Sequence, residues 1–133
     1  MCLEPAHFRA RYLAAAPVVA LLLSACAGSV GSGMVGLPAE EFERAFAAGY
    51  DVAAAERCGA AIDAGAVRHA LVTDVERRGH PPGIADKAGR TFDKTRSEFT
   101  QKLRARPDYC VTEYAVPPER LAQYAKGEFS AAR

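Results

Sequence analysis

The chain has 133 residues, of which 17 are Lys or Arg and 16 are Asp or Glu, so its formal net charge is +1. This balance argues against a broad surface for nucleic acid or anionic lipid. The length allows one ordinary domain after any targeting segment and is too short for two.

The first 25 residues have the pattern of an export signal. Arg9 and Arg11 precede an almost wholly apolar run over residues 12–23, which correspond to the positive and the apolar regions of such a signal. The run holds about a dozen residues, whereas a helix that spans a bilayer needs about 20. The sequence therefore predicts a cleaved signal peptide at residues 1–25 rather than a permanent transmembrane helix.

The apolar run closes with Leu23-Ser24-Ala25-Cys26, in which one aliphatic and two small residues lead into a cysteine. This motif resembles the lipobox of bacterial lipoproteins. The resemblance implies cleavage before Cys26, acylation of that cysteine and, because Ala27 rather than an aspartate follows, placement at the outer rather than the inner membrane. It covers only the N-terminal segment and identifies no family for the rest of the chain. The alternatives are an ordinary secretory cut after Ala25 or Ala27, and a cytosolic chain with an apolar start.

If this signal is present, the four cysteines have different roles. Cys2 leaves with the signal and Cys26 receives lipid, so Cys58 and Cys110 are left. In an oxidising periplasm we expect them to form a disulfide, which stabilises the fold by roughly 4 kcal/mol in the chain-entropy model. Free or metal-bound thiols are the alternative. No Cys-x-x-Cys pair and no zinc-ligand spacing is present, so we predict no metal and no cofactor.

The mature chain after the cut has a tether and one domain. Residues 26–37 are uncharged and rich in Gly and Ser, which predicts a flexible tether. A helical domain is expected at residues 38–129, and a frayed tail at residues 130–133.

A first helix is predicted to begin at Pro38 and to end at Gly49. Proline suits the first helical position, and the acids at positions 40, 41 and 43 suit the positive end of the helix dipole. The apolar residues at helical spacing, which we expect to face a core, are Leu37, Phe42, Phe46 and Tyr50.

A second helical region is predicted to begin with Asp51 as its N-cap and to end at Gly79. It holds two apolar stripes about 140° apart, which one straight helix cannot direct at a single core. We therefore expect a break or kink at Gly65. The first stripe is Val52, Ala55, Cys58 and Ile62, and the second is Val67, Leu71 and Val75.

The clearest helix is predicted to follow the turn at residues 80–83 and to stop at Pro107. Its opposite face carries the pairs Asp86 with Arg90 and Glu98 with Lys102, each at i,i+4. We interpret its apolar stripe as a core face rather than a ligand groove. The stripe is Ile84, Ala88, Phe92, Thr95, Phe99 and Leu103.

The C-terminal part is expected to be extended over residues 110–116 and clamped by the disulfide, since one strand has no partner here. A short last helix is predicted to begin at Pro117-Pro118 and to stop at Gly127. Its inward residues are expected to be Leu121, Tyr124 and Ala125.

These features predict an all-α fold. We expect a small bundle of four or five helices that is cross-linked by one disulfide and attached to a membrane through the lipid on Cys26. Such a protein suits a non-catalytic binding or assembly role in the cell envelope, facing the periplasm, with membrane lipid and an unidentified envelope protein as partners and no nucleic acid. The alternative is a small periplasmic enzyme, such as a cell-wall hydrolase, or an inhibitor of one. Its only loose set of chemical groups is Asp74, His80 and Asp86, so we predict no catalytic residues.

Overall fold

A computed structural model describes residues 36–130 of the chain, and within this range the fold is all-α, as predicted. The predicted signal peptide, Cys26 and most of the predicted tether lie outside the described residues. No helix within residues 36–130 is long and apolar enough to cross a membrane. The five helices are α1 (Ala39–Arg57), α2 (Ala64–Arg77), α3 (Pro82–Arg104), α4 (Tyr109–Thr112) and α5 (Pro118–Ala125).

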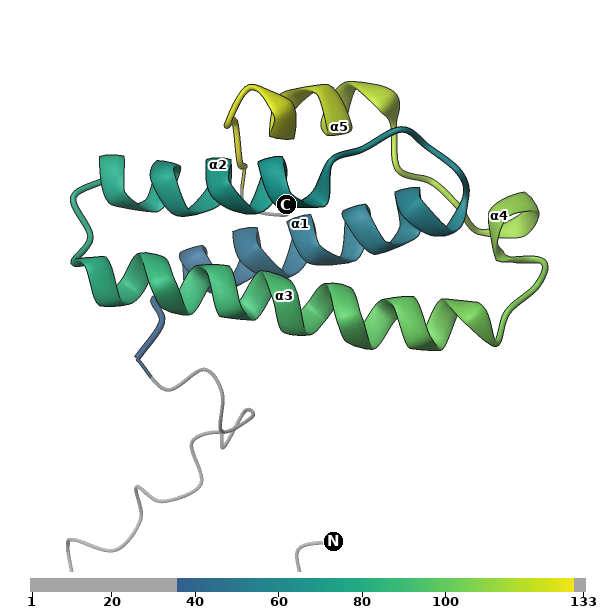
Figure 1. The fold of residues 1–133 in the computed structure, drawn as a ribbon, viewed down its shortest axis with the longest axis horizontal. Coiled ribbons are helices and arrows are strands. Elements are labelled where there is room, and N and C mark those ends of the chain that lie inside the picture. Colours follow the sequence, from purple (N-terminus) through teal and green to yellow (C-terminus); the bar gives the residue numbers. More distant parts are fainter. Residues whose placement is uncertain (1–35, 131–133) are drawn as a thin grey trace, which may run out of the picture.

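Helices α1, α2 and α3 form the body of the bundle (Figure 1). Helix α5 lies on the opposite side of this body from α3, and the single turn of α4 lies beyond the end of α1 (Figure 1). The main core joins small residues of α1 to branched and aromatic residues of α2 and α3. Its central members are Ala45, Ala48, Val52, Val67, Leu71, Val75, Ala88 and Phe92.

Helix α1 does not end at Gly49, and Asp51 is not an N-cap; both predictions are wrong. The helix continues to Arg57. A Cβ atom at Gly49 would lie 2.8 Å from the backbone oxygen of Phe92 and 3.0 Å from Cβ of Thr95. Glycine therefore serves close helix packing here, which outweighs its cost of about 1 kcal/mol in a helix interior.

The break between the two predicted stripes exists, but it precedes Gly65. Gly59 adopts a positive φ of 77° just after α1. Asp63 then caps α2, with its Oδ1 accepting a hydrogen bond of 3.0 Å from the amide of Ala66. Gly65 lies inside the first turn of α2. Gly59 thus ends α1, because glycine readily adopts a positive φ, and Asp63 starts α2, because its side chain caps the first turn.

The aromatic side chains of α1 are not the core face that the spacing predicted. Alanines and Val52 occupy that face, while Phe46 is 39% exposed and Phe42 and Tyr50 are half-buried. Leu37 does pack against the core. Close approach to α3 leaves room for small residues only, so the large rings lie at the edge of the contact.

The predicted stripe of α3 is largely confirmed, because four of its six members are buried and Ile84 and Phe99 are half-buried. Asp86 and Arg90 form the expected ion pair. Glu98 instead pairs with Lys94, at 3.9 Å. Lys102 lies over the ring of Phe99, with Nζ 5.0 Å from the centroid.

The C-terminal region differs most from prediction. Residues 109–112 form helix α4 rather than the start of an extended segment. Helix α5 is confirmed, with Tyr124 buried and Gly127 at a positive φ of 74° after its end. Ala125, expected inward, is exposed. Phe129 is buried and stacks on Tyr124 with the ring centroids 5.2 Å apart.

Gly49→Ala should destabilise the domain by about 1–3 kcal/mol, because the added methyl group meets backbone of α3 that cannot move aside. Gly83→Ala is the matched control, since a Cβ atom there has nothing within 4 Å. It should be neutral or stabilising by up to about 1 kcal/mol. Urea unfolding of both variants measures the difference; equal midpoints would contradict the close-packing account.

Candidate functional site: an apolar groove between α2 and α5

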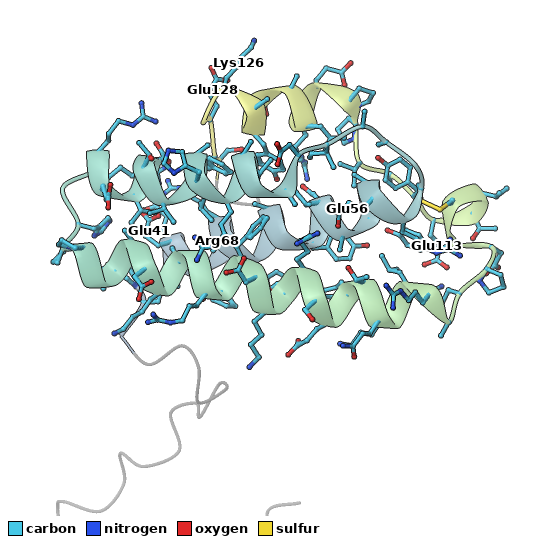
Figure 2. All side chains as sticks on the ribbon, in the orientation of Figure 1. Glu41, Glu56, Arg68, Glu113, Lys126 and Glu128 are labelled. Carbon is cyan, nitrogen blue, oxygen red and sulfur yellow. A yellow bond between two sulfur atoms is a disulfide. The ribbon has the colours of Figure 1, made fainter. Side chains whose placement is uncertain are left out.

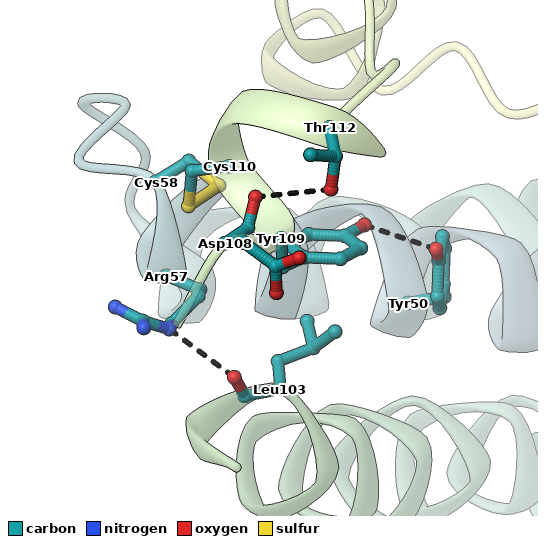
Figure 3. Close-up of a disulfide and its surroundings, with 8 residues drawn as sticks. All are labelled: Tyr50, Arg57, Cys58, Leu103, Asp108, Tyr109, Cys110 and Thr112. Atoms are coloured by element: carbon teal, nitrogen blue, oxygen red, sulfur yellow. Dashed lines mark hydrogen bonds between the residues drawn. A yellow bond between two sulfur atoms is a disulfide. The ribbon is translucent and has the colours of Figure 1, made fainter. Parts of the chain in front are cut away.

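The Cys58–Cys110 disulfide predicted from the sequence is present, with the two Cα atoms 5.3 Å apart (Figure 3). It ties α4 to the end of α1. Beside it, the hydroxyl groups of Tyr109 and Tyr50 share a hydrogen bond of 3.0 Å, and Arg57 Nε donates to the backbone oxygen of Leu103 at 3.3 Å (Figure 3). The disulfide thereby fixes the point at which the chain leaves α4 and continues toward α5.

Helix α5 is held by a polar contact to the middle of α1. The hydroxyl of Tyr124 donates a 2.6 Å hydrogen bond to Oδ2 of Asp51, and Arg120 Nη1 lies 3.4 Å from the same oxygen. Asp51 is 4% exposed, so its charge is stabilised by these two donors. Seventy-three positions separate Asp51 from Tyr124, so no local sequence pattern predicts their contact.

These attachments leave a groove of about 610 Å³ between the start of α2 and the segment that leads into α5. Val67 and Val116 are buried members of its lining, whereas Ala61, Ala66 and Ala122 are exposed. The remaining lining residues are Ala60, Ile62, Asp63, Tyr114, Pro118, Leu121 and Ala125.

The lining of this groove favours an apolar occupant. Asp63 is its only carboxylate, and Oδ1 of that residue already accepts the capping hydrogen bond of α2. Sites for small polar ligands combine an apolar pocket with several convergent polar groups that fix orientation. Aliphatic and alanine side chains dominate here, so the groove suits the apolar side chains of a protein segment. The sequence did not indicate it, because its two walls come from segments about 50 positions apart.

A buried ionic cluster lies at the other end of the bundle. Glu41, one of the acids assigned to the positive end of the first helix dipole, is 1% exposed and lies between the α2 and α3 ribbons in the view of Figure 2. Its Oε1 is 2.9 Å from Arg44, 3.2 Å from Arg78 and 3.2 Å from Nε2 of His80. His80, in the turn before α3, is therefore half-buried and bound to Glu41. The cluster ties the start of α1 to the end of α2.

Of the three groups of the enzyme alternative, Asp74 and His80 belong to one ionic cluster, and Asp86 pairs separately. Burial raises the pKa of Asp74, but Arg77 binds its Oδ1 and Arg78 its Oδ2. His80 contacts Glu41, and Asp86 pairs with Arg90 on the surface of α3. Each of the three groups thus has a charged partner, and Arg78 links Asp74 to the Glu41–His80 pair. Within residues 36–130, no three His, Cys, Asp or Glu side chains are grouped as metal ligands would be.

No protein-family model, no curated protein and no solved structure matches this chain.

The raised pKa values of Tyr109 and Tyr124 predict that the free energy of unfolding decreases at alkaline pH. Burial, reinforced by the hydrogen bond to Tyr50, raises the pKa of Tyr109 to about 12. Burial and the neighbouring Asp51 also raise the pKa of Tyr124. An unfolded tyrosine loses its proton near pH 10, so the folded state binds more protons above that pH. The stabilisation is complete below about pH 10 and declines as the pH rises toward the folded values.

Urea unfolding at about pH 8, 10 and 11 should therefore show stability falling above pH 10. The fall should be shallower in Tyr124→Phe, which removes one titrating hydroxyl. Tyr124→Phe should also lower stability at pH 8 by about 1–3 kcal/mol, since Asp51 loses its closest donor. An unchanged alkaline slope in the variant would contradict the role of Tyr124.

Proposed function

We propose that this protein is a lipid-anchored component of the bacterial cell envelope, a non-catalytic binding or assembly accessory that faces the periplasm from the outer membrane. The observation that carries the binding role is the apolar groove between α2 and α5. It offers about 610 Å³ lined by aliphatic and alanine side chains, which suits an apolar segment of a partner protein.

The proposed compartment draws support from the disulfide. A Cys58–Cys110 bond closes a loop of 52 positions and persists in oxidising compartments such as the periplasm. The proposed anchor draws support from the lipobox-like residues that end in Cys26. Two or more acyl chains hold a protein stably on a membrane without any spanning helix.

Cys26→Ser should abolish incorporation of labelled fatty acid and move the protein from the membrane fraction to the soluble fraction, because the acyl-accepting thiol is gone. Cys2→Ser is the matched control, since Cys2 lies in the segment that the signal cut removes. It should keep both lipid label and membrane association. Unchanged membrane association of Cys26→Ser would contradict the anchor.

A photoreactive amino acid at Ala61, on the groove lining, should capture one recurrent envelope protein in intact cells. Adding Ala122→Glu should reduce that adduct about tenfold or more, equivalent to at least 1.4 kcal/mol, because a carboxylate in the groove must lose water without a partner. Gln123→Glu, at an exposed neighbouring position outside the groove, should leave the adduct intact.

The identity of the captured material separates the hypotheses. One specific partner whose capture responds to Ala122→Glu but not to Gln123→Glu supports the groove as the binding site. Capture of lipid and abundant porins only, or equal effects of the two glutamates, argues against it.

A further inference from the structure

A line of aromatic side chains runs along the outer edge of the contact between α1 and α3. The ring centroids of Phe42 and Phe46 are 5.7 Å apart, those of Phe46 and Phe99 5.9 Å, and those of Tyr50 and Phe99 4.7 Å. Phe46 is 39% exposed, and the other three rings are half-buried. We call these four residues the aromatic edge.

Three of the four lysines of the chain lie along α3. Lys87, Lys94 and Lys102 are seven and eight positions apart, which is about two helical turns each, so they follow one another along one side of the helix. Lys102 adjoins the aromatic edge, because its Nζ lies over the Phe99 ring. The fourth, Lys126, lies just after α5, on the other side of the domain (Figure 2).

The near-neutral net charge conceals this uneven distribution. Residues 82–106, which comprise α3 and the turn after it, contain seven Lys or Arg and three Asp or Glu. Helix α1 contains five acidic and two basic residues. Overall neutrality led us to expect no broad surface for anionic lipid, but one helix of the bundle is distinctly basic.

The described chain also begins beside this helix. A Cβ atom at Gly36 would lie 2.8 Å from Nζ of Lys87. Ten positions separate Gly36 from Cys26, and ten residues span at most about 35 Å. This distance is about the length of a 23-residue helix such as α3. A lipid on Cys26 would therefore keep α3 within about one helix length of the membrane.

We propose that the aromatic edge, together with Lys87, Lys94 and Lys102, is the face that the domain lays against an anionic membrane surface. The proposal rests on the lipid anchor at Cys26 proposed above. Aromatic rings lie favourably at the boundary between headgroups and acyl chains, and lysines beside them attract anionic headgroups. Glu98 lies on the same helix, where it pairs with Lys94.

Charge favours a membrane over a second copy of the chain as the occupant. Two copies that met with α3 against α3 would bring two rows of lysines together, and like charges across an interface oppose association. In Figure 1, α5 and α3 lie on opposite sides of the bundle, so a membrane laid against α3 would leave α5, which lines the groove, on the side away from it. The groove would then be open to the periplasm.

The test uses tryptophan as a reporter, because the chain contains none. Phe46→Trp places the reporter on the aromatic edge, and Gln123→Trp places it on α5. Acylated full-length protein is bound to phosphatidylglycerol-containing vesicles whose acyl chains carry bromine, a contact quencher. Fluorescence of Phe46→Trp should be quenched several-fold more than that of Gln123→Trp. The difference should shrink from about 0.1 M to about 1 M salt, as the Debye length falls from about 10 Å to about 3 Å.

Two double variants that remove the same charge test the contribution of the α3 lysines to membrane docking. In the Phe46→Trp background, Lys94→Gln with Lys102→Gln should weaken docking of the face by on the order of thirty-fold, as expected for two basic groups near an anionic surface. Arg77→Gln with Lys126→Gln removes the same charge from the ends of α2 and α5 and should leave quenching unchanged.

The outcomes distinguish this proposal from the proposed function. If the protein binds vesicles but both tryptophans are quenched equally, or both charge pairs act equally, the orientation is overturned and the anchor stands. If the acylated protein binds no vesicles, the anchor and this orientation both fail. A concentration-dependent spectral shift of Phe46→Trp without vesicles would assign the face to a second copy and overturn the proposal.

Discussion

The close approach of α1 to α3 is the contact on which the rest of the structure depends. Gly49 touches the backbone of α3, and Ala45 and Ala48 are fully buried beside it. Because these side chains are small, the two helices pack with little between them, and the large rings of α1 are displaced to the edge. The same contact keeps α1 continuous to Arg57, so one helix reaches both the ionic cluster at its start and the disulfide at its end.

The C-terminal third depends on attachments to that continuous helix. Helix α4 has four residues and α5 has eight, and isolated helices of such length are unstable in water. The Cys58–Cys110 bond holds α4, and the Asp51–Tyr124 hydrogen bond holds α5. Between these two points the chain forms one wall of the apolar groove. The groove is thus a consequence of how short segments are fastened to α1.

The two proposed surfaces suit different kinds of partner, a protein segment and a lipid surface. The α2–α5 groove is uncharged apart from Asp63, as suits an apolar protein segment. The aromatic edge adjoins the lysines of α3, as suits an anionic lipid surface. Since α3 and α5 lie on opposite sides of the bundle, one orientation of the domain lets both surfaces be used together.

The sequence by itself determined the helical class, the α3 stripe, the helix end near Gly79 and the Cys58–Cys110 pair. These depend on local periodicity, on the conformational freedom of glycine, and on counting cysteines. It also carries the lipobox-like motif. Only the tertiary structure decided that Gly49 continues a helix, that Asp51 holds α5 and that the groove exists. Such features arise from contacts between segments distant in the chain, and a glycine or an aspartate has the same local signature whether it ends a helix or packs inside one.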